Sequence, residues 1–189
     1  MGNINTITQI DENTIKAEKG IKDLLIALEE NPEREGLKDT PKRVVKAFKE
    51  MTSGYGINVN EILSKTFTSD NNNEVEIDNI QFNSLCEHHM LPFIGTVKVK
   101  YTPKNGKVIG LSKIPRVVEA FTKRLQIQEK MTKEIAEAIQ NNLDCAGVYV
   151  EVEASHMCME LRGIKARGSK TRTVYKTGCY LRGDNNCKE

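Results

Sequence analysis

The stretch Val148-Tyr149-Val150-Glu151-Val152-Glu153-Ala154-Ser155-His156-Met157-Cys158 decides the fold, because apolar residues recur at every second position along it. A period of two is typical of a β-strand whose two faces differ. One face then carries Val148, Val150, Val152, Ala154, His156 and Cys158. Because this face ends in an imidazole and a thiol, we expect the strand to lead from the core into a pocket shared by His156 and Cys158.

Further strands are expected on both sides of this stretch. A partner strand over residues 171–180 is joined to it through the basic loop 162–168. Upstream, strands are predicted over 74–82, 95–102 and 107–111. The last two flank Asn105-Gly106, which is a strong hairpin signal. Antiparallel pairing is the expected result.

Helices are predicted before and between these strands. Residues 13–30 carry an apolar stripe of Ile21, Leu24, Leu25 and Leu28. Thr40 and Pro41 are suited to the N-cap and first position of a second helix that reaches Met51. Two more helices are expected over 115–124 and 128–142. The polar loop 69–73 separates an N-terminal helical segment, residues 1–70, from residues 74–189, and we expect one domain over 1–189.

Cysteine and histidine are clustered in two places, at Cys86-Glu87-His88-His89 and at His156-Met157-Cys158. A tight turn can direct the side chains of two residues that are three positions apart in the sequence, such as Cys86 and His89, toward one metal ion. Structural zinc sites usually close with four ligands in two pairs, whereas catalytic sites use three and leave a position for water. We therefore predict a catalytic Zn²⁺ held by Cys86, His89 and Cys158, with His88 and His156 beside it as proton-transfer groups. The alternative is a set of buried thiols and ordinary histidines.

Composition points to a single enzyme domain without a polyanionic or membrane partner. The 189 residues carry a net charge of only +2, so nucleic acid is not an expected partner. No apolar stretch is long enough to span a bilayer, and the first residues lack the pattern of a signal peptide. We expect a cytoplasmic protein. The five cysteines, odd in number, favour reduced thiols.

Four motifs between Thr40 and Tyr180 resemble GTP cyclohydrolase I. They are Cys-Glu-His-His at 86–89, Val-Ile-Gly-Leu-Ser-Lys at 108–113, Gln-Ile-Gln-Glu at 126–129 and His-Met-Cys-Met-Glu-Leu-Arg-Gly at 156–163. The resemblance implies a zinc-dependent hydrolase that converts GTP and water to 7,8-dihydroneopterin triphosphate and formate, the first step of tetrahydrofolate and pterin biosynthesis. It also implies an α+β tunnelling fold, with helices on one face of an antiparallel sheet, assembled as a homodecamer (a dimer of pentamers) with sites at subunit interfaces.

The resemblance also assigns roles to individual residues. It places the zinc ligands at Cys86, His89 and Cys158, in agreement with the spacing, and implies that Glu129 anchors guanine with help from Gln128. The triphosphate would be held by basic residues from more than one subunit, namely Arg43, Lys46, Lys113, Arg116 and Arg162. Each of these, taken singly, also fits a solvated basic surface.

The expected chemistry begins with attack of zinc-bound hydroxide on C8 of guanine. Deformylation, Amadori rearrangement of the ribose and ring closure follow. His156 would handle protons at the imidazole nitrogen of the base, His88 would serve the ribose side, and Ser112 would assist near the ribose.

The chain departs from the family pattern at a few positions. Tyr180 stands where Phe is common, Pro115 replaces a variable residue, and the chain stops at Glu189 where family members usually extend further. Two other classes remain open. One is a tunnelling-fold relative with another substrate, such as a nitrile reductase acting on a deazaguanine. The other is a nucleotide-binding or regulatory protein in which zinc only supports folding.

Overall fold

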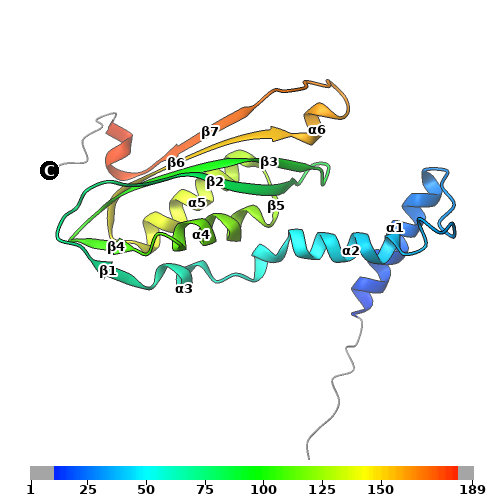
Figure 1. Ribbon diagram of the computed structural model, residues 1–189, viewed down its shortest axis with the longest axis horizontal. Coiled ribbons are helices and arrows are strands. Elements are labelled where there is room, and N and C mark those ends of the chain that lie inside the picture. The colour runs from blue at the N-terminus through cyan, green and yellow to red at the C-terminus, as the bar shows by residue number, and fades with distance from the viewer. Residues whose placement is uncertain (1–10, 183–189) are drawn as a thin grey trace, which may run out of the picture. The chain divides into compact units, whose positions relative to one another are not determined.

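The computed structural model describes residues 11–182, shown in colour in Figure 1. Contacts divide the chain into two compact units, one up to Glu50 and one from Met51 onward. That the chain acts as one functional domain stays a prediction. Residues 183–189, which include Cys187 and the short C-terminal end, lie outside the described residues.

The first unit consists of two helices, α1 (Glu12–Ala27) and α2 (Thr40–Met51). Asp11 caps α1, because its side chain accepts a hydrogen bond from the Asn13 N–H at 3.2 Å. The helix ends three residues before the predicted Glu30, and none of its residues is buried. Leu24 and Leu28 are 53% and 64% exposed, so much of the predicted apolar stripe lies at the surface. Thr40 is the first residue of α2 rather than its N-cap.

The second unit is built on a five-stranded sheet with the order β5-β2-β3-β6-β7. The strands are β2 (Val75–Cys86), β3 (Pro92–Pro103), β5 (Leu125–Gln126), β6 (Cys145–His156) and β7 (Thr171–Lys176). The long strands pair antiparallel, as predicted, whereas the short β5 runs parallel to the end of β2. The alternation along β6 is confirmed, because Val148, Val150, Val152 and Ala154 are all buried.

Two helices, α4 (Lys113–Thr122) and α5 (Gln128–Asn142), lie against one face of this sheet (Figure 1). Met131, Ile135 and Ile139 of α5 are fully buried, together with Val97 and Val99 of β3. Burial of such side chains is the main favourable term in folding, at roughly 1.5–3 kcal/mol each. The core therefore forms between the sheet and these helices, as expected for an α+β fold with helices on one face.

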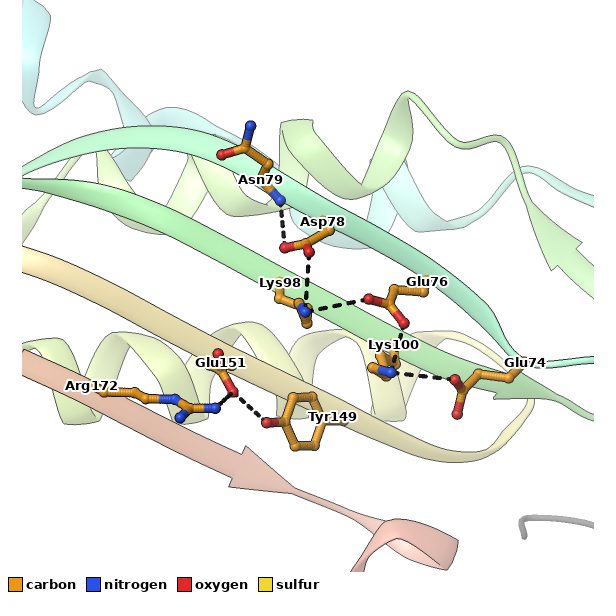
Figure 2. A network of polar contacts seen from close by, with 9 residues as sticks. All are labelled: Glu74, Glu76, Asp78, Asn79, Lys98, Lys100, Tyr149, Glu151 and Arg172. Atoms are coloured by element: carbon orange, nitrogen blue, oxygen red, sulfur yellow. Dashed lines mark hydrogen bonds and ion pairs between the residues drawn. The ribbon is translucent and has the colours of Figure 1, made fainter. Parts of the chain in front are cut away.

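The opposite face of the sheet carries charged side chains in columns (Figure 2). Lys98 and Lys100 of β3 pair with carboxylates of β2, at distances of 2.6–3.5 Å. Arg172 of β7 pairs with Glu151 of β6. The β2 carboxylates are Glu74, which immediately precedes the strand, Glu76 and Asp78. The columns thus alternate in sign across the sheet, acidic on β2, basic on β3, acidic on β6 and basic on β7.

The predicted hairpin at Asn105-Gly106 is only half right. The turn forms, with φ of 52° and 65° at these residues and a 3.0 Å hydrogen bond from Lys107 N to Lys104 O. However, the strand that follows, β4 (Lys107–Ile109), pairs with β1 (Thr66–Thr68) and not with β3. The physical reason is that β2 and β6 already occupy both edges of β3.

Several further elements differ from the prediction. The short α3 (Val59–Leu63) and a 3-10 helix, η1 (Ser53–Gly56), were not expected. The last predicted strand ends at Lys176, and η2 (Gly178–Arg182) replaces its remainder. Cys86, Cys145 and Cys158 are free thiols, but Cys179 is disulfide-bonded. The expectation of reduced thiols is wrong there, because an odd total still leaves room for a pair.

Candidate active site

A tight turn at the end of β2 brings Cys86 and His89 together. Met90 N donates to Cys86 O at 2.8 Å, and Cys86 N donates to Leu91 O at 2.9 Å. Met90 adopts a left-handed φ of 56°, which closes the turn and starts β3. The sequence prediction that a turn directs both side chains to one point is therefore confirmed.

Cys158 reaches the same point from a helix, not from a strand. β6 ends at His156, and Cys158 lies in the single-turn helix α6 (Met157–Glu160). The prediction that Cys158 continues the strand face was wrong, because the chain leaves the sheet two residues earlier. Nevertheless the ligand atoms of Cys86, His89 and Cys158 all lie within 4.8 Å of one another.

The chemistry of this donor set suits zinc. Two thiols and one imidazole are soft to borderline ligands, which favour Zn²⁺ over Mg²⁺ or Ca²⁺. Burial raises the pKa of the Cys158 thiol, and the neighbouring Cys86 raises it further. A thiol pair of this kind needs a nearby positive charge to stay ionised, which a divalent cation supplies. The three residues therefore fit a zinc site with three protein ligands.

Arg162, in the loop after α6, also contacts this cluster. Its Nη1 lies 2.8 Å from Nε2 of His89. A guanidinium only donates hydrogen bonds, so Nε2 of His89 is the acceptor. This contact brings one of the predicted phosphate-binding residues to the edge of the zinc site.

A cleft of about 240 Å³ opens beside the zinc ligands. His88 lies in its wall, with Nδ1 3.6 Å from the Cys86 sulfur. Glu129, in the first turn of α5, lines the cleft as well. The full lining consists of Cys86, His88, Gln126, Ile127, Gln128, Glu129, His156, Cys158, Met159 and Thr171.

His156 is held by two neighbours. Its ring stacks on Phe93, the residue opposite it on β3, with centroids 4.7 Å apart and planes 2° apart. Its Nε2 lies 2.7 Å from Oε1 of Gln128. Burial lowers the pKa of His156, and the nearby Glu129 carboxylate partly opposes this shift. His156 thus favours the neutral form, which is the form that accepts a proton.

The remaining predicted residues lie outside this cleft. Ser112 precedes α4, and Lys113 and Arg116 are in its first turns. The far end of α4 leads into β5, which pairs with Cys86. A ten-residue helix spans roughly 15 Å, so these residues sit well away from the cleft. Arg43 and Lys46 are in α2 of the first unit, where Arg43 pairs with Asp39 at 3.3 Å.

Sequence reasoning missed the residues that support His156. Phe93 and Thr173 act through strand register, which sets Phe93 opposite His156 and Thr173 opposite Val152. Thr132 lies one turn after Gln128 on α5. The period of two along β7 was a usable signal for Thr173, but the pairing partner was not visible in the sequence.

Comparison with known proteins identifies the family. The family model for GTP cyclohydrolase I matches residues 17–189. The chain is 50% identical over 175 residues to GTP cyclohydrolase 1 of Campylobacter jejuni subsp. jejuni serotype O:6, covering 92% of both chains. It is 50% identical over 171 residues to GTP cyclohydrolase 1 of Clostridium kluyveri, covering 90% of this chain and 91% of the other.

Among solved structures, an archaeosine synthase QueF-Like in the apo form matches with a TM-score of 0.48 and 17% identity, over 58% of this chain and 97% of the other. None of the helices within residues 11–182 has the length and apolar character of a membrane span. From the family match and the extent of the identity, we conclude that the chain belongs to the GTP cyclohydrolase I family.

Proposed function

We propose that the chain converts GTP and water to 7,8-dihydroneopterin triphosphate and formate in the cleft beside Cys86, His89 and Cys158. The activity is inferred from membership of the GTP cyclohydrolase I family. The location is inferred from one observation. The three ligand atoms lie within 4.8 Å of one another beside a cleft that Glu129 and His156 also line. The proposal also places the protein in the cytoplasm, as its sequence predicts.

Zinc held by Cys86, His89 and Cys158 would activate water as a nucleophile near neutral pH and polarise the substrate. Three protein ligands would leave a zinc ion at this site free to take a further, non-protein ligand such as water. The chain holds the three ligands on two elements, namely the turn after β2, which carries Cys86 and His89, and helix α6, which carries Cys158.

Glu129 is the residue that we assign to guanine recognition. One carboxylate accepts hydrogen bonds from both the ring N–H and the exocyclic amine of guanine. Adenine lacks this donor pair, so the same carboxylate disfavours ATP. The position of Glu129 in the wall of the cleft supports the assignment.

His156 and His88 are the proposed proton carriers. His156 lines the cleft in a fixed orientation and is biased toward the neutral form, so it is suited to move protons at the imidazole ring of guanine as that ring opens. His88 also lines the cleft, next to Cys86, and is assigned to the ribose.

We infer that the triphosphate is bound between subunits. Arg162 lies beside the zinc cluster, whereas Ser112, Lys113 and Arg116 lie at the far end of α4. One chain therefore does not bring these groups to a single substrate, and a neighbouring copy must supply the second set. Arg43 and Lys46 would complete the phosphate contacts. This arrangement fits the predicted homodecamer, a dimer of pentamers.

The sheet supports such an assembly. The long strands β2, β3, β6 and β7 alternate in direction, so β7 of one copy would meet β2 of the next in antiparallel orientation. The basic column on β7 would then face the acidic column on β2, which continues the alternation of charge within one chain (Figure 2). β5 covers only Leu85 and Cys86 of the β2 edge.

The test is product formation from nucleotides. Zinc-loaded protein incubated with GTP should release formate and develop the near-ultraviolet absorbance of a dihydropterin, and ATP should give neither. Glu129→Gln should lower kcat/KM for GTP by roughly 100-fold or more, since it loses a charge-assisted acceptor. Absence of formate from GTP with the wild-type protein would refute the proposed function.

A further inference from the structure

The side-chain amide of Gln128 has its orientation fixed by the groups around it. Nε2 donates to Val152 O at 3.1 Å and to Thr171 O at 3.0 Å, and it lies 3.1 Å from Thr173 Oγ1. Carbonyl oxygens only accept, so the NH₂ end of the amide must face them. Gln128 is only 2% exposed, so water does not offer an alternative partner for a flipped amide.

Two threonine hydroxyls complete the same assignment. Thr132 Oγ1 donates to Gln128 O at 2.7 Å. The hydroxyls of Thr132 and Thr173 are 2.6 Å apart, so the Thr173 O–H must donate to Thr132. Thr173 Oγ1 therefore has a lone pair that faces Gln128 Nε2 and can share one of its two hydrogens with a carbonyl. Every polar hydrogen in this buried group is therefore accounted for.

The fixed amide in turn decides which nitrogen of His156 carries the proton. Gln128 Oε1 faces His156 Nε2 at 2.7 Å, and an amide oxygen only accepts. Nε2 must therefore be protonated. A neutral imidazole has one N–H, so Nδ1 has the free lone pair. The stack on Phe93 fixes the plane of the ring.

We propose that Gln128 is a positioning residue, which accepts a hydrogen bond from Nε2–H of His156 and thereby leaves Nδ1 as the atom that exchanges protons during opening of the guanine ring. This rests on the proposed function of the cleft. It gives Gln128 a role different from the guanine contact that the family resemblance implies. During turnover Nδ1 takes one proton from the attacking water and passes it to the ring nitrogen that is released from C8, so His156 ends the cycle in its starting tautomer.

Nitrogen-15 NMR of the histidine rings in the zinc-loaded full chain tests the tautomer directly. The chain has only three histidines, so His156 is identified by its absence in His156→Ala. The wild type should show Nε2 protonated and Nδ1 bare, and Gln128→Met should show a mixture of both tautomers. Gln140→Met is the matched control, because Gln140 is on the same helix and donates to Cys145 O at 3.1 Å without contacting His156.

Steady-state kinetics give the second measurement. Gln128→Met should lower kcat roughly 10- to 100-fold, within the contribution of a general acid-base group, and change KM for GTP less than about twofold. Gln140→Met should keep the wild-type kcat. A rise in KM with an unchanged His156 tautomer would overturn the proposal, because it would show that Gln128 binds guanine instead.

Zinc content and circular dichroism show whether Gln128→Met is folded. If it is not, Thr173→Val removes one anchor of the amide and should produce a smaller shift toward the second tautomer. An unshifted tautomer in Thr173→Val, or a wild-type His156 protonated at Nδ1, would overturn the proposal. The NMR spectrum tests the role of Gln128 even if the wild type forms no formate. Absence of formate would count only against the proposed function.

Discussion

At the scale of single residues, the contact between His89 and Arg162 has a direct consequence for metal binding. His89 accepts from Arg162 through Nε2, so its proton is on Nδ1. A metal that binds Nε2 takes the lone pair that Arg162 uses. A metal that binds Nδ1 moves the proton to Nε2, which then no longer accepts. Binding of His89 to zinc would therefore replace this hydrogen bond and would leave Arg162 available to an anionic group such as the proposed triphosphate.

Removal of the Arg162 side chain should consequently strengthen zinc binding. Arg162→Met should lower the Kd for zinc roughly fivefold, the equivalent of about 1 kcal/mol for one hydrogen bond. Competition with a chromophoric chelator measures this. Arg167→Met is the matched control, since it removes the same charge from the same loop without a contact to His89. Equal effects in both variants would show that only net charge matters.

The buried thiol of Cys145 leads us to predict that the folded protein becomes less stable at alkaline pH. Burial, followed by the neighbouring Asp144, raises the pKa of this thiol from 9.0 to about 11. The folded protein therefore keeps the proton at pH values where the unfolded chain loses it. The free energy of unfolding should be undiminished below about pH 9 and should fall as pH rises through about 11, by about 2–3 kcal/mol.

Urea unfolding between pH 8 and 11 tests this prediction. Cys145→Ala should lose the Cys145 contribution, so its free energy of unfolding should decline less steeply with pH than that of the wild type. Parallel curves for the two proteins would contradict the assignment.

At the scale of elements, η2 is attached to the sheet through Tyr180. Its hydroxyl donates to Glu74 at 2.7 Å and lies 3.3 Å from Thr102 Oγ1. Tyr180→Phe should lower the free energy of unfolding by about 0.5–1.5 kcal/mol and speed amide hydrogen exchange in η2. Tyr175→Phe, which removes a hydroxyl bonded to Glu137, should leave exchange in η2 unchanged. If both variants exchanged alike, Tyr180 would not anchor η2.

The elements also show what the sequence could predict. Periodicity located β6 and the full span of α5, because both bury one face against the same core. It failed at β4, because local turn chemistry does not reveal that both edges of β3 are occupied. It failed at Cys158 for a related reason, since a strand pattern does not show where the chain leaves the sheet. Cys86, His89 and Cys158 were nevertheless expected to meet, and their ligand atoms do lie within 4.8 Å of one another, because the short α6 keeps Cys158 near the end of β6.

At the scale of the whole molecule, we expect the core to persist without the metal. Val97, Val99, Val150 and Ile135 are fully buried in a large apolar cluster that includes Cys86 and against which Cys158 packs, so most of its side chains are not metal ligands. Removal of zinc with a chelator should therefore abolish formate release and leave the far-ultraviolet circular dichroism largely unchanged. Loss of the spectrum would favour the alternative in which zinc only supports folding.

Assembly is the second prediction at this scale. Light scattering should give ten times the mass of one chain if the proposed homodecamer forms, and a multiple of that mass in any case if the proposed phosphate-binding residues on α4 serve the cleft of a neighbouring copy. A mixture of Lys113→Ala and Cys158→Ser chains should regain activity, since some interfaces then combine two intact halves. Full activity in a monomer would contradict a shared site.

The most direct measurement is formate release from GTP while zinc is titrated into chelator-treated protein. The structure predicts that the rate rises in proportion to zinc and reaches its plateau at one zinc per chain, and that Cys158→Ser remains inactive at the same zinc ratios. Formate release that is independent of zinc, or a wild-type rate in Cys158→Ser, would contradict a reaction at the site formed by Cys86, His89 and Cys158.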